Sequence, residues 1–501
     1  MMSCKNALCL AALCLLVTSS GLRAQNPSHV KTYSISEIET FGGNTSSLFG
    51  LNNAGKTAGW AETADVDPTS CFGDGSLVFR GFIWNRGKLT QIGTFGGNNS
   101  QANALNANGS AVGFAETSDP DPNFPPCLIS HAFLFERGVL SDLGTLDTGN
   151  NSQALGLNNV GQIVGFSETG ALDPNFGFPL IHAFLWRNHN LEELPTLGGA
   201  NAAAGAVNDS GLVLGFSETS TDIDPVLGFP DYHAALWRNG QIIDIGTLGG
   251  SISGIGTASL PFFANRSFNN AGQVTGYAQT SSGSSDPVPE FTTFTPVPGP
   301  AFNNEVHAFR WQDGATHDIG TLGGGFSEGT ALNDRGHVAG ISSADHVPDP
   351  DNIDWFGVPF PKIHGALWRS GKAIDLGTLG GPVAQVFAMN NCDQVVGWSV
   401  LSDNISLDAF LWQDGTMVDL NSLIPQNSGW QLIQATQIND RGQIGGIGIL
   451  NGQLRAFLLT PSKDDALSAP SLPGSGRQAM RVRPSTNKRS GTRPTSHSTL
   501  R

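Results

Sequence analysis

The sequence predicts an all-β fold, a β-propeller of about eight four-stranded blades, and three observations support this prediction. A unit of roughly 50 residues recurs along most of the 501-residue chain. The strand-like pieces of each unit are apolar on both faces, which requires a neighbouring sheet on each side. The two ends of the repeat region carry complementary parts of one unit. A seven-bladed ring with one unit displaced and an open β-solenoid are the alternatives.

The repeat is clearest at a Thr-Leu-Gly-Gly element. Successive copies are separated by 54, 51, 51, 51, 74, 57 and 44 residues, and they begin at Thr40, Thr94, Thr145, Thr196, Thr247, Thr321, Thr378 and Ser422. Three equal spacings in a row rarely arise by chance, so the chain is a repeat array. Its 64 glycines and low content of charged residues (14%) suit short strands joined by tight turns.

Each unit is predicted to contain four strands. In the third unit these cover residues 140–146, 152–157, 162–167 and 182–186. The second and third are joined by Asn158-Asn159-Val160-Gly161, where Gly accepts the left-handed conformation. Elsewhere the fourth piece runs into the next unit through Asn239-Gly240, Asp313-Gly314 or Asp414-Gly415, dipeptides that favour a two-residue hairpin turn.

Side-chain alternation indicates how the sheets are stacked. Ile163, Val164 and Phe166 cannot all lie on one side of a strand, so both sides of the sheet are expected to be buried. Small sheets arranged around an axis meet this requirement. Small residues such as Ala154, Gly156 and Gly165 then allow adjacent blades to approach closely.

The chain ends are expected to close the ring. The segment 30–39 lacks a preceding strand of its own unit, and 455–459 lacks a following one, so their pairing would remove two sheet edges. Strands of the His-Ala-Phe type begin at Arg80, His131, His182, His233, His307, His364, Asp408 and Arg455, which gives eight units.

The motifs HAFLW, D-[LI]-G-T-L-G-G and N-[ND]-x-G-Q-[IV]-V-G recur over residues 30–460. At these residues the chain resembles the HAF family of probable extracellular repeat proteins. The resemblance implies an exported bacterial protein and supplies no activity. The first His is replaced at Arg80, Asp408 and Arg455, so it is not required in every unit.

The chain is expected to consist of a signal peptide (1–24), the propeller (25–461) and a disordered basic tail (462–501). Lys5 precedes the apolar run 7–17, and Leu22-Arg23-Ala24 offers a cleavage site. The tail is rich in Ser, Pro, Thr and Arg. Setting aside the +2 of the leader and the +6 of the tail from the total of −16 leaves −24 on the body. An acidic body argues against nucleic acid as a partner, and no later segment is apolar for long enough to span a membrane.

The mature chain keeps three cysteines. Cys71 and Cys127 lie in the same kind of loop in adjacent units, and an oxidising compartment would permit a disulfide between them. Three unpaired cysteines are the alternative, and the sequence does not assign a state to Cys392.

The variable loops before the His-Ala-Phe strands are expected to share one rim, and they hold the candidate site residues. Candidate ligand-binding residues for a protein or glycan are Asp173, Phe178, Asp222, Asp224, Phe229, Trp355 and Phe356. Candidate oxygen ligands for Ca²⁺ are Asp119, Asp121, Asp349 and Asp351. The alternative interpretation is that Asp caps turns, Pro stiffens them and the aromatic rings cover the blade ends.

The predicted function is that of a secreted, extracellular or periplasmic propeller that binds a protein or glycan and is not an enzyme. A secreted polysaccharide hydrolase or lyase is one alternative, since propellers can gather acids around a channel without a linear motif. A structural envelope or adhesion component is the other. The recurrent histidines are interpreted as hydrogen-bonded structural residues, with the Glu at positions 62, 116, 168 and 218 as one possible partner.

Overall fold

The computed structural model describes residues 32–462 except 70, 72, 74, 226, 257–265, 285–303 and 354–358. The chain divides into two units, Met1–Ser462 and Lys463–Arg501. The predicted signal peptide, the predicted tail from residue 463, and Trp355 and Phe356 lie outside the described residues. Among the residues described, the structure holds no helix long and apolar enough to span a membrane.

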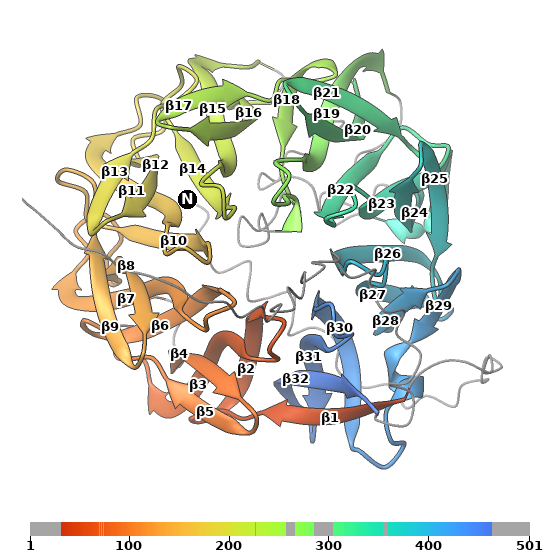
Figure 1. The fold of residues 1–501 in the computed structure, drawn as a ribbon, viewed down its shortest axis with the longest axis horizontal. Coiled ribbons are helices and arrows are strands. Elements are labelled where there is room, and N and C mark those ends of the chain that lie inside the picture. The colour runs from red at the N-terminus through yellow and green to blue at the C-terminus, as the bar shows by residue number, and fades with distance from the viewer. Residues whose placement is uncertain are drawn as a thin grey trace, which may run out of the picture. The chain divides into compact units, whose positions relative to one another are not determined.

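The first unit is a ring of eight four-stranded blades, as predicted (Figure 1). Each of blades 1 to 4 is a run of four consecutive strands: β2 (Gly42–Leu51), β3 (Thr57–Val66), β4 (Leu77–Asn85), β5 (Lys88–Gln91); β6 (Gly96–Leu105), β7 (Ala111–Pro120), β8 (Leu128–Glu136), β9 (Val139–Gly144); β10 (Ser152–Leu157), β11 (Ile163–Leu172), β12 (Pro179–Arg187), β13 (Asn190–Glu193); β14 (Ala202–Val207), β15 (Val213–Ile223), β16 (Pro230–Arg238), β17 (Gln241–Asp244).

Blades 5 to 7 follow the same order, and blade 8 takes its fourth strand from the start of the chain: β18 (Gly249–Gly254), β19 (Val274–Gly283), β20 (Asn304–Gln312), β21 (Ala315–Gly320); β22 (Ser327–Leu332), β23 (Val338–Ile353), β24 (Pro359–Arg369), β25 (Lys372–Gly377); β26 (Gly380–Met389), β27 (Val395–Leu401), β28 (Leu407–Gln413), β29 (Thr416–Asp419); β30 (Trp430–Ile438), β31 (Ile444–Leu450), β32 (Gln453–Pro461), β1 (Tyr33–Ile38). A 3₁₀ turn, η3 (Leu420–Leu423), precedes blade 8.

The predicted closure is confirmed. β1 pairs antiparallel with β32, in a register that sets Tyr33 opposite Pro461 and Ile38 opposite Ala456. Blade 8 therefore combines three strands from the end of the repeat region with one from its beginning. In Figure 1, β1 lies at the outer edge of that blade, beside β32.

Tight turns connect the strands as the sequence predicts. Asn239 and Gly240 have φ of 52° and 78°, the two positive angles that a primed hairpin turn requires. Because strands alternate in direction, the hairpins between second and third strands lie on one face of the ring, here called the loop face. The Asn-x-x-Gly turns between first and second strands lie on the opposite face, the turn face.

A closed belt of asparagines joins the eight blades on the turn face. Each belt asparagine donates an Nδ2 hydrogen bond to the main-chain carbonyl of its counterpart in the next blade, at 2.9–3.3 Å. The donors, in order, are Asn52, Asn106, Asn158, Asn208, Asn269, Asn333, Asn390 and Asn439, whose bond returns to Asn52. Each Oδ1 also accepts main-chain amides of its own turn, as Asn52 does from Ala54 and Lys56. The belt explains why asparagine recurs in these turns.

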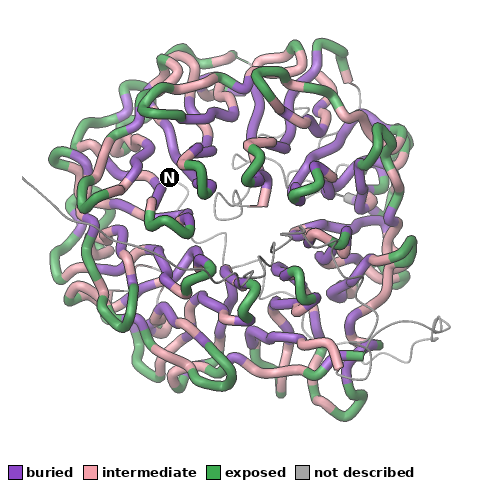
Figure 2. Tube along the Cα trace, viewed as in Figure 1, coloured by how far each residue is buried: buried purple, intermediate pink, exposed green. Residues whose placement is uncertain are grey.

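The blade interiors are dry, as the two-sided apolar pattern predicts. Phe82, Phe133 and Phe184, which are the Phe of the His-Ala-Phe strands in blades 1 to 3, are fully buried. In Figure 2 the buried residues follow the strands, and the exposed residues gather at turns and loops. A Cβ on Gly156 would meet the main chain of Gly205 and Ala206, so the small residue permits blades 3 and 4 to approach.

Candidate functional site

The hairpins between second and third strands carry most of the exposed large apolar side chains of the described residues. Those in the hairpins or the strand ends beside them are Val66, Phe124, Leu172, Phe176, Phe178, Ile223, Val347 and Ile405; Val139 and Val160 lie elsewhere. Six of the eight belong to blades 1 to 4. We define the rim hairpins as residues 63–76, 117–127, 169–178 and 219–229 of these four consecutive blades.

The aspartate that precedes proline in the first three rim hairpins is buried and structural. Asp173 is 5% exposed, and its Oδ1 accepts the amides of Asn175 and Phe176. Its Oδ2 accepts Nδ2 of Asn201, which belongs to the next blade. Asp173 was a candidate ligand-binding residue, but both of its oxygens already bind groups of the protein. The alternative interpretation, an aspartate that caps a turn, describes it better.

This contact is one of three equivalent Asp–Asn–Glu clamps between blades. In each clamp the Asn Nδ2 contacts both an Asp of the preceding blade and a Glu of its own blade. The three clamps are Asp67–Asn99–Glu116, Asp121–Asn151–Glu168 and Asp173–Asn201–Glu218. The Asn Oδ1 accepts a main-chain amide of the preceding blade, as Asn99 does from Phe79 at 3.0 Å.

Burial is costly for the carboxyl groups of these clamps. Desolvation raises the pKa of Glu116 above its ordinary value; hydrogen bonds from Asn99 and Asn98 oppose this shift, and the charge of Asp67 adds to it. Desolvation likewise raises the pKa of Glu218 against the bonds from Asn201 and Ala200. The amides of each asparagine region therefore compensate part of the cost of burying two carboxyl groups at one interface.

Two further contacts connect neighbouring rim hairpins. Cys71 and Cys127 form a disulfide between the hairpins of blades 1 and 2. Asn175 Nδ2 donates to the carbonyl of Thr221 at 2.8 Å and so joins the hairpins of blades 3 and 4. The third cysteine, Cys392, is a free exposed thiol on the turn face.

The other predicted ligand residues differ in accessibility. Phe178 is 52% exposed, and Asp222 is exposed in the hairpin of the next blade. Asp224 Oδ1 accepts the amide of Leu227, and the half-buried Phe229 packs near Tyr232, with ring centroids 5.9 Å apart. Phe178 and Asp222 thus present free surface, whereas Asp224 and Phe229 support the hairpin.

The predicted calcium ligands do not gather in one place. Asp121 is buried in its clamp, and Asp119 is exposed two residues earlier. Asp349 contacts Lys362 at 3.5 Å, and Asp351 accepts a hydrogen bond from Asn404. Within the described ranges, no group of three His, Cys, Asp or Glu residues is placed to hold a metal ion.

The histidines of the repeat bind a different partner from the one expected. Each pairs through Nδ1 with a carboxylate eleven residues later on the fourth strand of its own blade: His131–Asp142, His182–Glu193, His233–Asp244, His307–Asp318 and His364–Asp375. The expected partner was the glutamate at the end of the second strand, and that suggestion is wrong because Glu116, Glu168 and Glu218 bind the clamp asparagines. The histidines are spread around the ring, in keeping with a structural role.

Blade 7 replaces this histidine with a carboxyl group. Asp408 stands where blades 2 to 6 carry His and is followed eleven residues later by Asp419. Desolvation, together with the charge of Asp419, raises the pKa of Asp408 to about 7. Desolvation also raises the pKa of Asp419, against hydrogen bonds from Asn421.

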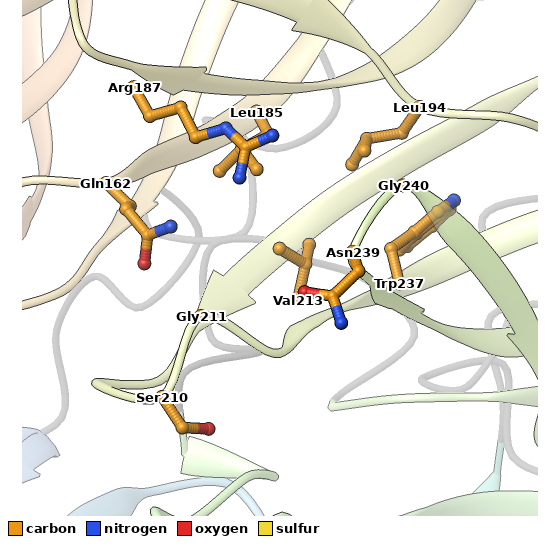
Figure 3. A pocket seen from close by; sticks show the side chains of 10 residues that line it. All are labelled: Gln162, Leu185, Arg187, Leu194, Ser210, Gly211, Val213, Trp237, Asn239 and Gly240. Carbon is orange, nitrogen blue, oxygen red and sulfur yellow. The ribbon is translucent and has the colours of Figure 1, made fainter.

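The turn face carries two hollows. One of about 70 Å³ lies between blades 3 and 4, and Figure 3 shows Gln162 and Arg187 on one side of it and Asn239 and Trp237 on the other. Arg187 already binds Glu192 at 2.8 Å. The other is an open cavity of about 280 Å³ lined by turns of the asparagine belt, where Asn53 and Asn391 both donate hydrogen bonds to Asp440. In both hollows, polar side chains of the lining already form ion pairs or hydrogen bonds within the protein.

Sequence reasoning identified the loop face but not the clamps or the belt. The signal for the clamps was present as Asp-Pro in one unit, Asn after Gly-Gly or Gly-Asn in the next, and Glu at the end of that unit's second strand. These residues form a clamp only when the blades that carry them are adjacent in space. The signal for the belt is the Asn that opens each turn between the first and second strands, in seven Asn-x-x-Gly turns and in Asn390-Asn391-Cys392-Asp393. The sequence pattern alone indicates only a turn at these positions.

Comparison with known proteins gives only weak structural likenesses. No protein-family model and no curated protein matches it. The β-propeller domain of the Trilobed protease from Pyrococcus furiosus, described as having an open velcro topology, is similar with a TM-score of 0.40 and 9% identity over 78% of this chain and 98% of that one. Pyrococcus horikoshii acylaminoacyl peptidase has a TM-score of 0.39 and 10% identity over 76% of this chain and 53% of its own. YCF48 bound to D1 peptide has a TM-score of 0.34 and 9% identity over 88% and 98%. Likenesses this weak do not bear on what this chain does.

Proposed function

We propose that this chain is an exported, non-enzymatic propeller that binds a protein or glycan partner through the rim hairpins of blades 1 to 4. The observation that carries the proposal is that, among the described residues, six of the eight exposed Phe, Leu, Val and Ile side chains of the second-to-third-strand hairpins lie in these four hairpins. Contiguous exposed apolar surface on a soluble protein commonly marks an interaction site.

The connections between the rim hairpins support the same proposal. A disulfide and a hairpin-to-hairpin hydrogen bond cross this surface, and a clamp anchors each of the first three hairpins to the next blade. A surface held in one conformation loses little conformational entropy when a partner binds. The surface is therefore suited to recognition.

Export is part of the proposal. A leader-like segment (1–24) and the similarity of the repeats to HAF-type extracellular proteins support it, and so does the Cys71–Cys127 disulfide, because such bonds persist mainly in oxidising compartments. Fractionation of the source cells, with detection of the protein and its amino terminus, tests this part. Retention in the cytoplasm with an intact leader would contradict it.

The binding role is tested by changing the rim without changing the ring. A rim variant carries Phe124→Ser, Leu172→Ser, Phe178→Ser and Ile223→Ser, and a matched control carries Val139→Ser and Val160→Ser, which are similarly exposed but lie on the turn face. Wild type and both variants are applied to arrays of extracellular proteins and of glycans. The proposal requires a partner that wild type and the control retain and the rim variant loses. A partner retained equally by all three would show that binding occurs elsewhere.

A further inference from the structure

In two of the four rim hairpins an exposed acidic side chain and an exposed apolar side chain directly precede the aspartate of the Asp-Pro pair. In the first hairpin the exposed Asp65 and Val66 precede the buried Asp67. In the fourth the exposed Asp222 and Ile223 precede Asp224. The second hairpin has Asp119 at the acidic position, and the third has Leu172 at the apolar position. Carboxylates and apolar groups are thus interleaved across four neighbouring blades.

No basic residue occurs in these hairpins. Residues 63–76, 117–127, 169–178 and 219–229 contain neither Lys nor Arg. Over the described part of the chain, the side chains of Asp65, Asp119 and Asp222 form no salt bridge. The negative charge of Asp119 and Asp222 is therefore available to a partner. Asp65 also interacts with Arg80, where burial lowers the pKa of the guanidinium and the charge of Asp65 opposes that effect.

The polar features of the rim favour a protein over a sugar. The apolar side chains do not distinguish the two: Val66, Leu172 and Ile223 are aliphatic and offer no flat face to a sugar ring, whereas the exposed Phe124, Phe176 and Phe178 offer a ring face to a sugar and to an apolar side chain alike. The carboxylates Asp67, Asp121 and Asp173, which would otherwise bind sugar hydroxyls, already accept the clamp asparagines. Apolar side chains of a protein segment match the first group, and Lys or Arg match the exposed aspartates.

We infer that the partner of the rim hairpins is a protein segment that presents basic and apolar side chains together. This inference rests on the proposed binding function and adds the chemistry of the partner. The apolar side chains supply most of the buried area. The exposed aspartates Asp65, Asp119 and Asp222 select the sign of the charge and accelerate association.

The inference is tested with short synthetic peptides of one leucine pattern, in which the intervening residues are Lys, Ser or Glu. Binding to the intact, oxidised protein is measured by fluorescence anisotropy at low and high salt. The Lys peptide is expected to bind at least about 10-fold more tightly than the Ser peptide, with the Glu peptide weakest. High salt should reduce the difference, because it screens exposed charges.

Two variants separate the contributions of charge and apolar surface. A variant that combines Asp65→Asn, Asp119→Asn and Asp222→Asn should bind the Lys peptide about 10-fold more weakly than wild type does. Its affinity for the Ser peptide should be unchanged. The rim variant should lose all peptides, and the Val139→Ser, Val160→Ser control should keep them. A chitosan oligomer, which is cationic but a glycan, should bind more weakly than the Lys peptide.

Each contrary outcome has a distinct meaning. Equal binding of the Lys and Glu peptides, or no effect of the three Asp→Asn changes, would contradict the inference that the partner is basic. If the rim variant still loses binding in that case, the proposed binding function of the rim hairpins stands. Chitosan or a neutral oligosaccharide that binds the rim better than any peptide also overturns the inference and leaves a glycan-binding function. No binding of the Lys peptide overturns the inference, while the array experiment judges the function separately.

Discussion

The two halves of the ring differ at one position beside the first strand of each blade. Blades 2 to 4 carry the asparagine of a polar clamp there, in addition to apolar contacts with the preceding blade, whereas blades 5 to 7 carry an apolar side chain. We call blades 1 to 4 the clamped half and blades 5 to 8 the apolar half. At the position of Asn99, Asn151 and Asn201, blades 5 to 7 carry Ile252, Phe326 and Val383, all buried. These three residues belong to one apolar cluster that extends from blade 4 to blade 7. Within a single repeat, the same geometric position is therefore satisfied by hydrogen bonds in one half and by apolar packing in the other.

The difference shows how the loop face can vary while the ring stays regular. In blades 1 to 3 an aspartate of the rim hairpin enters the interface, so hairpin and interface are one structural unit. In the apolar half, Phe326 and Val383 pack instead in an apolar cluster, which also includes Leu227 of the blade-4 hairpin. Among the described residues, the hairpins of the clamped half also present six of the eight exposed aromatic and aliphatic side chains that lie in such hairpins.

The largest expected effect on stability comes from replacing a clamp asparagine with an apolar residue, as blades 5 to 7 carry at the same position. Asn99→Leu leaves Asp67 and Glu116 buried without Nδ2 of Asn99, and the free energy of unfolding should fall by about 3–5 kcal/mol. Phe326→Leu, at the matching position of blade 6, should cost only roughly 1–2 kcal/mol. Chemical denaturation of both variants measures the difference.

The origin of that loss can be isolated. Adding Asp67→Asn and Glu116→Gln to Asn99→Leu removes both carboxylates and should restore part of the lost stability. Equal costs for Asn99→Leu and Phe326→Leu, with no restoration, would mean that the clamp is no more than a packing contact.

Removal of the disulfide should have the next largest effect on stability. Its local effect on hydrogen exchange should be confined to the clamped half. Cys71→Ser with Cys127→Ser should lower the free energy of unfolding by about 2–4 kcal/mol, since a closed loop constrains the unfolded chain. Cys392→Ser, on the exposed thiol, is the control and should change stability by less than about 0.5 kcal/mol. Hydrogen exchange should quicken in the hairpins of blades 1 and 2. Faster exchange in blades 5 to 7 instead would break the proposed link between the disulfide and the rim.

One carboxyl group in the apolar half sharpens the comparison, because it lacks the amides that Glu116 has. Glu328 is 1% exposed, and its Oε1 has no hydrogen-bond partner among the described residues. Desolvation raises its pKa well above the ordinary value. A raised folded-state pKa gives a contribution to stability that is complete below the unfolded pKa of about 4.3 and is lost as pH rises through the folded pKa.

Glu328→Gln should therefore stabilise the protein increasingly as pH rises, by roughly 1–3 kcal/mol in alkaline solution, and have little effect near pH 4. Thermal unfolding across the pH range checks this. Glu116→Gln should not give the same gain, because three hydrogen bonds already serve Glu116. A pH-independent effect of Glu328→Gln would contradict the assigned cause.

The smallest effect is expected at the half-exposed His–Asp pairs, which occur in both halves of the ring. Burial alone raises the pKa of Asp142, but the hydrogen bonds from His131 and Gly144 and the charge of His131 outweigh it and lower the pKa. Its contribution is present above the unfolded pKa of about 3.9 and is lost as pH falls through the lower folded value. Asp142→Asn should cost about 0.5 kcal/mol at neutral pH, with solvent screening included.

Asp375→Asn is the counterpart in the apolar half, since the pKa of Asp375 is lowered in the same way. The two variants should lose the same amount at neutral pH and nothing in strong acid. Unequal losses in the two halves would show that the pairs are coupled to the blade interfaces.

Most of the fold could be predicted from the repeat, because each repeat shows the lengths of its strands, the residues of its turns and an apolar pattern on both faces of its strands. The spacing of Thr196 and Thr247, and the Asn239-Gly240 turn, describe one blade almost completely. Closure through β1 was also predictable, since the two chain ends are complementary. The clamps were not predictable, because Asp67 and Asn99 are 32 residues apart and meet only when blades 1 and 2 are adjacent.

The candidate site was predicted at the level of the loop face but not of the single residue. Phe178 and Asp222 are exposed as a binding surface requires. Asp173 is buried, because the sequence does not distinguish an aspartate that caps its own turn from one that faces solvent. The distinction depends on Asn201, which the next blade supplies.

The most direct test of a binding rim in the clamped half is a hydrogen-exchange footprint of the oxidised protein with and without the Lys-containing peptide. Protection is expected in residues 63–76, 117–127, 169–178 and 219–229, with no change in the turns that hold Asn53, Asn391 and Asp440 on the opposite face. Protection confined to those turns, or spread evenly over all eight blades, would contradict the assignment of the partner to the rim hairpins.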